Sequence, residues 1–156
     1  MLGPANQEIL MRARTDLRLG VPIVLAGKEK EAIIAPKELL SQSRLDEITL
    51  FDEVSFILIT ARRAQTLNCS IYDGNFVRIE LGQASEITSL KAIADPSLDL
   101  KNPLKGPFNV IRDKTLKLEN ETLLLLKSDQ LLPAAIVSQI TDGKKYASDH
   151  NLTYLQ

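Results

Sequence analysis

The chain has 156 residues, a length that fits one domain spanning residues 1–156. Hydrophobic residues make up 44% and charged residues 25% of it, which is typical of a globular protein and excludes wholesale disorder. Nineteen basic and twenty acidic residues leave a net charge of −1, so no overall field draws the protein to nucleic acid or to an anionic membrane. We therefore expect neither as a partner.

The single cysteine and the single histidine limit the chemistry that the chain can perform. Cys69 alone can form neither an internal disulfide nor a zinc site that needs two or more cysteines. His150 has no spaced catalytic partner, so a solvated residue at a helix end is the simpler interpretation. No apolar run reaches about 18 residues, and the start lacks a basic segment before an apolar one. We expect no membrane span, no secretory signal and a cytoplasmic location.

Helical and strand patterns alternate through the first half of the chain. Apolar side chains at helical spacing are followed by Gly20, which suits a left-handed C-terminal cap. Two short apolar runs joined by a turn at Gly27-Lys28 predict a β-hairpin, and Pro36 fits the first position of a second helix. In chain order, the predicted elements are a helix at 6–19, strands at 22–26 and 32–35, a weaker helix at 36–48, a strand at 54–60 and a short helix at 61–67.

The second half continues the alternation. Ser85 can cap a helix, and three prolines within residues 95–107 predict a loop after it. The predicted elements are a strand at 76–81, a helix at 85–94, a buried helix at 116–126, a strand at 134–140, a short helix ending near residue 150 and a strand at 152–155. Interleaved helices and strands predict a sheet covered by helices, which is an α/β or mixed α+β fold.

Charged clusters offer candidate sites without naming a reaction. The chain has no Gly-rich phosphate loop and no zinc-ligand spacing. Arg62 and Arg63 follow a strand directly and could bind phosphate, with Lys105 of the Pro-rich loop as a further donor; surface charge is the simpler interpretation. Residues 28–31 alternate in sign, which favours a solvated hairpin tip over a metal or substrate loop.

Five segments, taken in order, carry a family resemblance. They are Gly20–Leu25, Phe56–Ala64, Leu90–Ser97, Leu131–Ile140 and Asp149–Leu152. Together they resemble the 3,4-dihydroxy-2-butanone 4-phosphate synthase family of riboflavin biosynthesis over about residues 12–155. The resemblance implies that family's fold, a sheet covered by helices.

The resemblance also implies that the family's catalytic positions are altered. The long acidic loop, which supplies a magnesium-binding carboxylate in the family, is reduced here to residues 27–32, where Glu29 and Glu31 remain. Leu118 stands where the family has a metal-binding histidine, and Gln139 stands where it has a glutamate. Magnesium prefers anionic oxygen ligands. The resemblance therefore implies no catalytic residue, no metal site and no cofactor in this chain.

Some segments resemble one branch of the family more closely. These are Leu58–Ala64, Asn102–Phe108 and Leu131–Ala135, which look like the degenerate N-terminal domain of alphaproteobacterial GTP cyclohydrolase II proteins. The cyclohydrolase domain itself, whose zinc needs three cysteines, is absent from this chain. The resemblance implies an inactive, structural domain that forms a homodimer or packs against a cyclohydrolase domain in cis.

Two alternatives remain open from the sequence. The first is an active, magnesium-dependent synthase with a rearranged metal site. Its carboxylates would come from Glu29, Glu31, Glu119 and Glu121. The second is a regulatory module that binds phosphate or a nucleotide through Arg62, Arg63 and Lys105.

Overall fold

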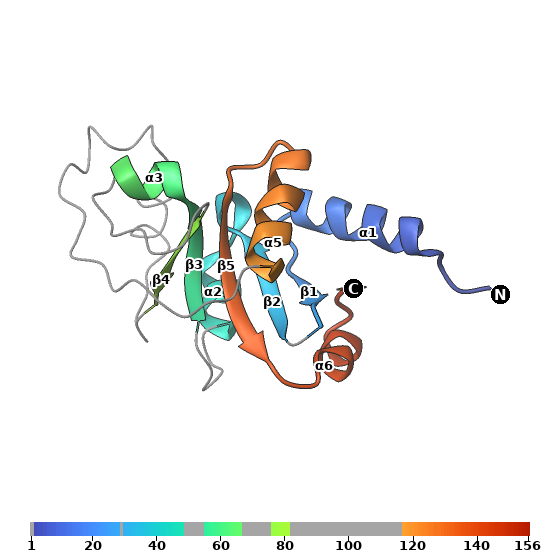
Figure 1. The fold of residues 1–156 in the computed structure, drawn as a ribbon. Helices are drawn as coiled ribbons and strands as arrows, with labels where there is room; N and C mark the ends of the chain where they lie inside the picture. Colours follow the sequence, from blue (N-terminus) through green and yellow to red (C-terminus); the bar gives the residue numbers. More distant parts are fainter. Residues whose placement is uncertain (1, 29, 49–54, 67–75, 82–116) are drawn as a thin grey trace.

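A six-stranded sheet forms the centre of the protein (Figure 1). The computed structural model describes residues 2–28, 30–48, 55–66, 76–81 and 117–156. Within these residues the strand order is β4-β3-β5-β2-β1-β6, and only the pairing of β1 with β6 is parallel. The strands are β1 (Ile23–Ala26), β2 (Glu31–Pro36), β3 (Ser55–Thr60), β4 (Phe76–Glu80), β5 (Ala134–Ile140) and β6 (Tyr154–Leu155).

Helices cover both faces of the sheet, so the predicted fold class is confirmed. They are α1 (Asn6–Arg18), the 3-10 turn η1 (Lys37–Leu39), α2 (Gln42–Ile48), α3 (Ala61–Thr66), α5 (Lys117–Ser128) and α6 (Gly143–Asp149). Buried side chains of α1 and α5 pack on one face, and those of α2, α3 and α6 pack on the other. In Figure 1, α5 lies in front of the sheet and α2 behind it. No helix in the described ranges has both the length and the apolar character needed to cross a bilayer.

The alternation of side chains along each strand decides which face every site residue meets. In β2, Ala32 packs with the layer that contains α1 and α5, whereas Ile33 packs with the layer that contains α2 and α6. In β5, Val137 belongs to the α5 layer and Ile136 to the other layer. Two neighbouring residues of one strand therefore meet different chemical surroundings.

Most predicted boundaries agree with the structure, and one does not. Gly20 has φ +80°, and a Cβ there would lie 2.7 Å from the carbonyl oxygen of Leu39, so both the backbone and the space require glycine. Pro36 was predicted to begin a helix, which is wrong, because it ends β2 opposite Ala135. The α-helix starts later, at Gln42, where the Ser41 hydroxyl accepts the Arg44 backbone N–H at 3.3 Å. The predicted helix 85–94 and loop 95–107 lie outside the described residues.

Candidate functional site

The structure brings Leu118 and Gln139, two positions that the resemblance singles out, to the same end and the same face of the sheet. Leu118, at the start of α5, lies beside the β1–β2 turn, where a Cβ on Gly27 would be 3.7 Å from its Cδ1. Gln139 is paired with Ala32 next to this turn, and it shares the face of Val137. The turn, Leu118 and Gln139 thus lie at one end of the sheet, on the face that α5 covers.

Glu31, in contrast, belongs to the opposite face. Its carboxylate accepts the backbone N–H of Gly143, the first residue of α6, and the hydroxyl of Tyr154 at 2.9 Å. Burial, followed by the hydrogen bond to Glu31, raises the pKa of Tyr154 above its usual value. A Cβ on Gly143 would lie 2.7 Å from the same carboxylate, so glycine makes this contact possible. Glu31 holds α6 against the hairpin. Glu29 lies outside the described residues.

A buried glutamate that the altered positions do not include lies next to Leu118. Glu119 is 0% exposed, and its Oε1 lies 3.8 Å from Nη1 of Arg78, a buried residue of β4 that also lies over the Phe56 ring at 5.7 Å. Neither carboxylate oxygen accepts a hydrogen bond within the described part of the chain. Desolvation raises the pKa of Glu119, and its own backbone N–H, Arg78 and Lys30 oppose that rise.

These residues do not fit a magnesium ion. Leu118 has no donor atom, and Gln139 offers only a neutral amide, whereas magnesium needs several oxygen ligands in octahedral geometry. The charges of Arg78 and Lys30 already act on the Glu119 carboxylate, and they disfavour a further cation nearby. No group of three or more His, Cys, Asp or Glu side chains suited to a metal occurs among the described residues. Glu121, a candidate carboxylate of the alternative active synthase, is exposed and lines a different surface.

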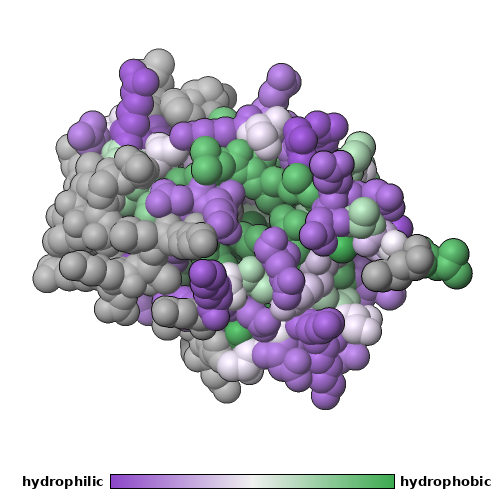
Figure 2. Space-filling model, turned by 45° about the vertical axis from the view of Figure 1, so that its right-hand side comes forward, coloured by the Kyte–Doolittle hydropathy of each residue, from purple (hydrophilic) through white to green (hydrophobic). Residues whose placement is uncertain are grey.

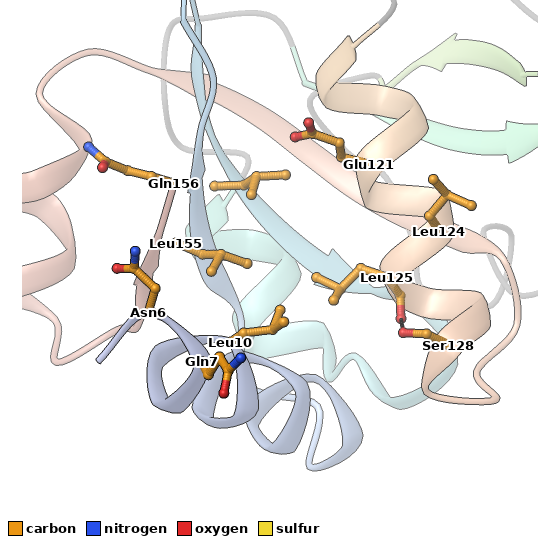
Figure 3. A pocket seen from close by; sticks show the side chains of 10 residues that line it. Asn6, Gln7, Leu10, Glu121, Leu124, Leu125, Ser128, Leu155 and Gln156 are labelled. Carbon is orange, nitrogen blue, oxygen red and sulfur yellow. Dashed lines mark hydrogen bonds between the residues drawn. The ribbon is translucent and has the colours of Figure 1, made fainter. Parts of the chain in front are cut away.

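That surface is a groove of about 560 Å³ between α1, α5 and the C-terminal strand (Figure 3). Leucine side chains from all three elements point into it, and polar side chains stand at its edge. The lining residues are Asn6, Gln7, Leu10, Leu25, Glu121, Leu124, Leu125, Ser128, Leu155 and Gln156. Figure 2 shows hydrophobic surface gathered in the middle of this face, with hydrophilic side chains around it. A patch of this kind marks an interaction surface in many proteins.

The sequence patterns did not predict this groove. The helix at 116–126 was predicted to be buried, but Leu124, within its run of four leucines, is 65% exposed, so that part of the prediction is wrong. Four consecutive leucines on a helix span all of its sides, because successive residues are about 100° apart. A signal was therefore present: one leucine of such a run must point away from the sheet.

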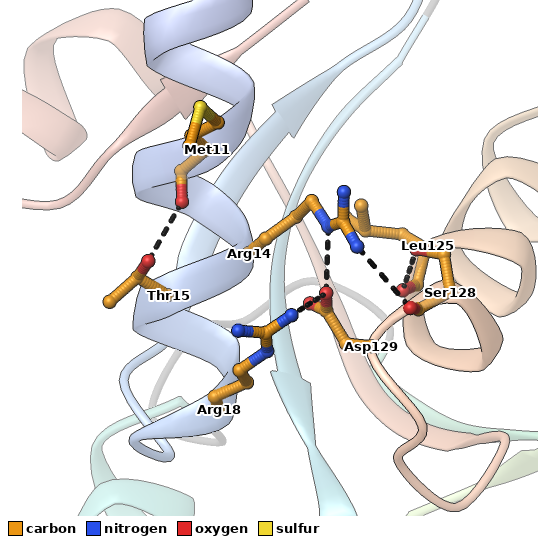
Figure 4. Close-up of polar contacts among 7 residues, drawn as sticks. All are labelled: Met11, Arg14, Thr15, Arg18, Leu125, Ser128 and Asp129. Carbon is orange, nitrogen blue, oxygen red and sulfur yellow. Dashed lines mark hydrogen bonds and ion pairs between the residues drawn. The ribbon is translucent and has the colours of Figure 1, made fainter.

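Ion pairs fix the wall of the groove that α1 forms (Figure 4). Arg14 Nε lies 2.7 Å from Oδ1 of Asp129, directly after α5, and Arg18 Nη2 lies 3.5 Å from the same oxygen. Arg14 also donates to the carbonyl of Ser128 at 3.3 Å. The side chain of Asp129 is fully buried. The two helices that line the groove are thus held together at one end by charge.

The predicted phosphate donors are partly brought together. Arg62 and Arg63 of α3 line one cavity of about 320 Å³, whereas Lys105 lies outside the described residues. His150 is exposed at the end of α6, as predicted, where its ring stacks on Tyr146 with centroids 4.1 Å apart. Cys69 lies outside the described residues.

Comparison with known proteins shows similarity in structure but none in sequence. No protein-family model matches the chain, and no curated protein matches it. The two-domain 3,4-dihydroxy-2-butanone 4-phosphate synthase RibBX of A. baumannii superimposes with a TM-score of 0.66 at 12% identity, over 93% of this chain and 54% of its own. The chain has a dihydroxybutanone-phosphate-synthase-like fold. The Candida albicans 3,4-dihydroxy-2-butanone 4-phosphate synthase agrees, with a TM-score of 0.65 at 12% identity over 94% of this chain and 92% of its own.

This synthase-like chain spans about half the length of the A. baumannii protein. At such low identity the likeness establishes the fold, and function has to be argued from the residues themselves.

Proposed function

We propose that this chain is a catalytically inactive synthase-like domain of riboflavin biosynthesis, which acts in the cytoplasm through association. The observation that carries the proposal is the donor set beside the turn, Leu118 and Gln139: an aliphatic side chain, a neutral amide and a buried glutamate whose charge is influenced by Arg78 and Lys30. A divalent ion that polarised a sugar phosphate there would have a single carboxylate ligand, which already lies near two cations, whereas magnesium needs several oxygen ligands.

Turnover of ribulose 5-phosphate tests the inactive state. The full chain is incubated with ribulose 5-phosphate and millimolar magnesium, with the Candida albicans synthase as the positive control under the same conditions. We expect no product above the uncatalysed background from this chain, and no heat when magnesium is titrated into it. Product formation, or saturable magnesium binding, would favour the active synthase instead.

The association that we propose is with a second copy of the chain, through the exposed stripe of α5. Glu121, Leu124 and Lys127 are all exposed and are spaced three residues apart, so they share one side of the helix. If two copies of α5 pack antiparallel about a two-fold axis at Leu124, Glu121 of each copy meets Lys127 of the other. The stripe is therefore complementary to itself in charge, and the apolar groove next to it continues the contact surface.

Sedimentation velocity on the parent chain and four variants tests this interface. We expect the parent chain to be a dimer at tens of micromolar and Leu124→Glu to be a monomer. Leu19→Glu serves as the control, since Leu19 is also exposed but lies outside the groove. Glu121→Lys should weaken the dimer, and the pair Glu121→Lys with Lys127→Glu should restore it. A monomeric parent, or no rescue by the charge swap, would contradict the proposed surface.

A cyclohydrolase domain in the same protein is the second partner that we propose, with GTP cyclohydrolase II as the parent. It is supported by the superposition on about half of a two-domain protein. The test is to mix this chain with a separately purified GTP cyclohydrolase II domain and to measure co-sedimentation and GTP turnover. We expect a complex of the two; two species that sediment independently at all concentrations would contradict it.

A further inference from the structure

The cavity beside α3 lies apart from the positions discussed so far. It is formed by the end of β3, by α3 and by the residues that lead into β5. Ala134 lines it at the first position of β5, whereas Gln139 lies five residues further along the same strand. At about 3.3 Å per residue, these two positions are roughly 17 Å apart. The cavity and the altered family positions therefore occupy opposite ends of β5.

The polar side of the cavity carries two arginines and two threonines. Arg62 is exposed, whereas Arg63 is only 8% exposed. The hydroxyl of Thr60 accepts the backbone N–H of Arg63 at 3.1 Å, and the hydroxyl of Thr66 donates to the carbonyl of Arg62 at 3.3 Å. Both bonds are to backbone atoms, so they fix the backbone of α3 from which the two arginine side chains extend. Guanidinium groups bind carboxylate and phosphate oxygens through paired hydrogen bonds.

The opposite side of the cavity is apolar and fixed. Ile59, Leu132, Pro133 and Ala134 form it. The backbone N–H of Leu132 donates to the carboxylate of Glu38 at 3.0 Å, which holds this loop in place. Glu38 itself does not line the cavity. A volume of about 320 Å³ is at the lower end of the range for small-molecule sites.

We infer that this cavity binds a small organic phosphomonoester, with its phosphate at Arg62 and Arg63 and its apolar body against Leu132 and Pro133. A phosphomonoester carries a charge of about −1.5 to −2 at neutral pH and has three acceptor oxygens, so it offers guanidinium donors more charge and more acceptors than a carboxylate does. Inorganic phosphate offers the charge but leaves the apolar wall uncovered. The inference does not depend on the proposed function, because it concerns other residues at another end of the sheet.

Isothermal titration calorimetry with three probes tests the inference on the full chain. Phenyl phosphate has both the charge and the apolar body, inorganic phosphate lacks the body, and benzoate replaces phosphate with a carboxylate. We expect phenyl phosphate to bind at least tenfold more tightly than either of the other two. Equal binding of phenyl phosphate and inorganic phosphate would show general attraction of anions and would overturn the inference. The absence of any binding of phenyl phosphate at 10 mM would overturn it too.

Three arginine variants locate the probe. Arg62→Ala should weaken the binding of phenyl phosphate at least tenfold, since a hydrogen bond to a charged group is lost. Arg12→Ala is the matched control, because Arg12 is an exposed arginine of α1 far along the chain from the cavity, and it should leave the affinity unchanged. Arg62→Lys keeps the charge but loses the paired donors of the guanidinium group, so its affinity for phenyl phosphate should lie between those of the other two variants. Equal affinities for Arg62→Ala and the parent would overturn the assignment. The melting temperature without ligand checks that each variant folds.

Discussion

Helix α5 has a buried carboxylate at each end, and the two carboxylates differ in how closely arginine side chains approach them. Asp129, after the last turn, receives Arg14 at 2.7 Å and Arg18 at 3.5 Å, both on its Oδ1. Glu119, in the first turn, has Arg78 at 3.8 Å and accepts no hydrogen bond from the described residues. Of these three distances, only the 2.7 Å between Arg14 and Asp129 is typical of a charge-assisted hydrogen bond.

The difference follows from where the arginines come from. Arg14 and Arg18 belong to a surface helix and keep part of each side chain in water, so they can turn toward Asp129 at little desolvation cost. Arg78 is buried in the sheet and positioned over Phe56. A buried ion pair stabilises a fold only when its geometry repays desolvation. We therefore infer that Asp129 anchors α1, whereas the charge of Glu119 is disfavoured.

The largest effect is expected at Asp129, which has the shorter ion pair although its Oδ2 accepts no hydrogen bond from the described residues. Asp129→Ala removes the partner of two arginines and should lower the free energy of unfolding by about 2 kcal/mol, less than for a fully buried pair because both arginines can reach water. Urea unfolding measures the change, and hydrogen exchange should increase in α1. Arg12→Ala, an exposed change on the same helix, should stay within about 0.5 kcal/mol of the parent. An unchanged urea midpoint for Asp129→Ala would show that the ion pairs do not hold α1.

A smaller effect of opposite sign is expected at Glu119. Its pKa is raised above the ordinary value of 4.5, so the folded state binds a proton more tightly than the unfolded state does. The resulting stability is complete below pH of about 4.5 and is lost as the pH rises through the folded-state pKa. Glu119→Gln, which mimics the neutral form, should match the parent in acid and exceed its stability at pH 8.

The measurement is the difference in urea midpoint between Glu119→Gln and the parent from pH 4.5 to pH 8. Taking the difference removes the titration of all other groups. A difference that grows with pH supports a disfavoured charge. A variant that becomes less stable than the parent as the pH rises would mean that Arg78 compensates Glu119 fully after all.

The sequence was sufficient for features that depend on local patterns. The hairpin of β1 and β2, the strand β5 and the glycine at position 20 all follow from apolar runs and from backbone freedom, and the structure has each of them. The prediction for Pro36 was wrong because its fixed φ suits the end of a strand as well as the start of a helix. Only its pairing with Ala135 decides between the two.

The candidate site was harder to predict because it depends on pairing between distant segments. A one-residue difference in register decides that Glu31 faces α6 and not Leu118, and no local pattern fixes this. The partners of Glu119 and Asp129 lie 41 and 115 residues away from them in the sequence. The exposure of Leu124 is likewise set by how α5 lies on the sheet. Composition cannot supply any of these facts.

The smallest effect on stability is expected at Glu31, a third carboxylate to compare with Asp129 and Glu119. It lies at the same end of the sheet as Glu119, on the opposite face, and both its oxygens accept hydrogen bonds. Tyr154→Phe removes one of the two and should cost about 1 kcal/mol, since Glu31 is only partly buried and water can replace the hydroxyl. A double-mutant cycle with Glu31→Gln isolates this bond from other effects of each change. Independent sites are additive to within about 0.3 kcal/mol. A coupling energy below that value would mean that the contact between Tyr154 and Glu31 does not stabilise the fold. The difference between Glu31 and Glu119 would then not be explained by the hydrogen bonds that Glu31 accepts.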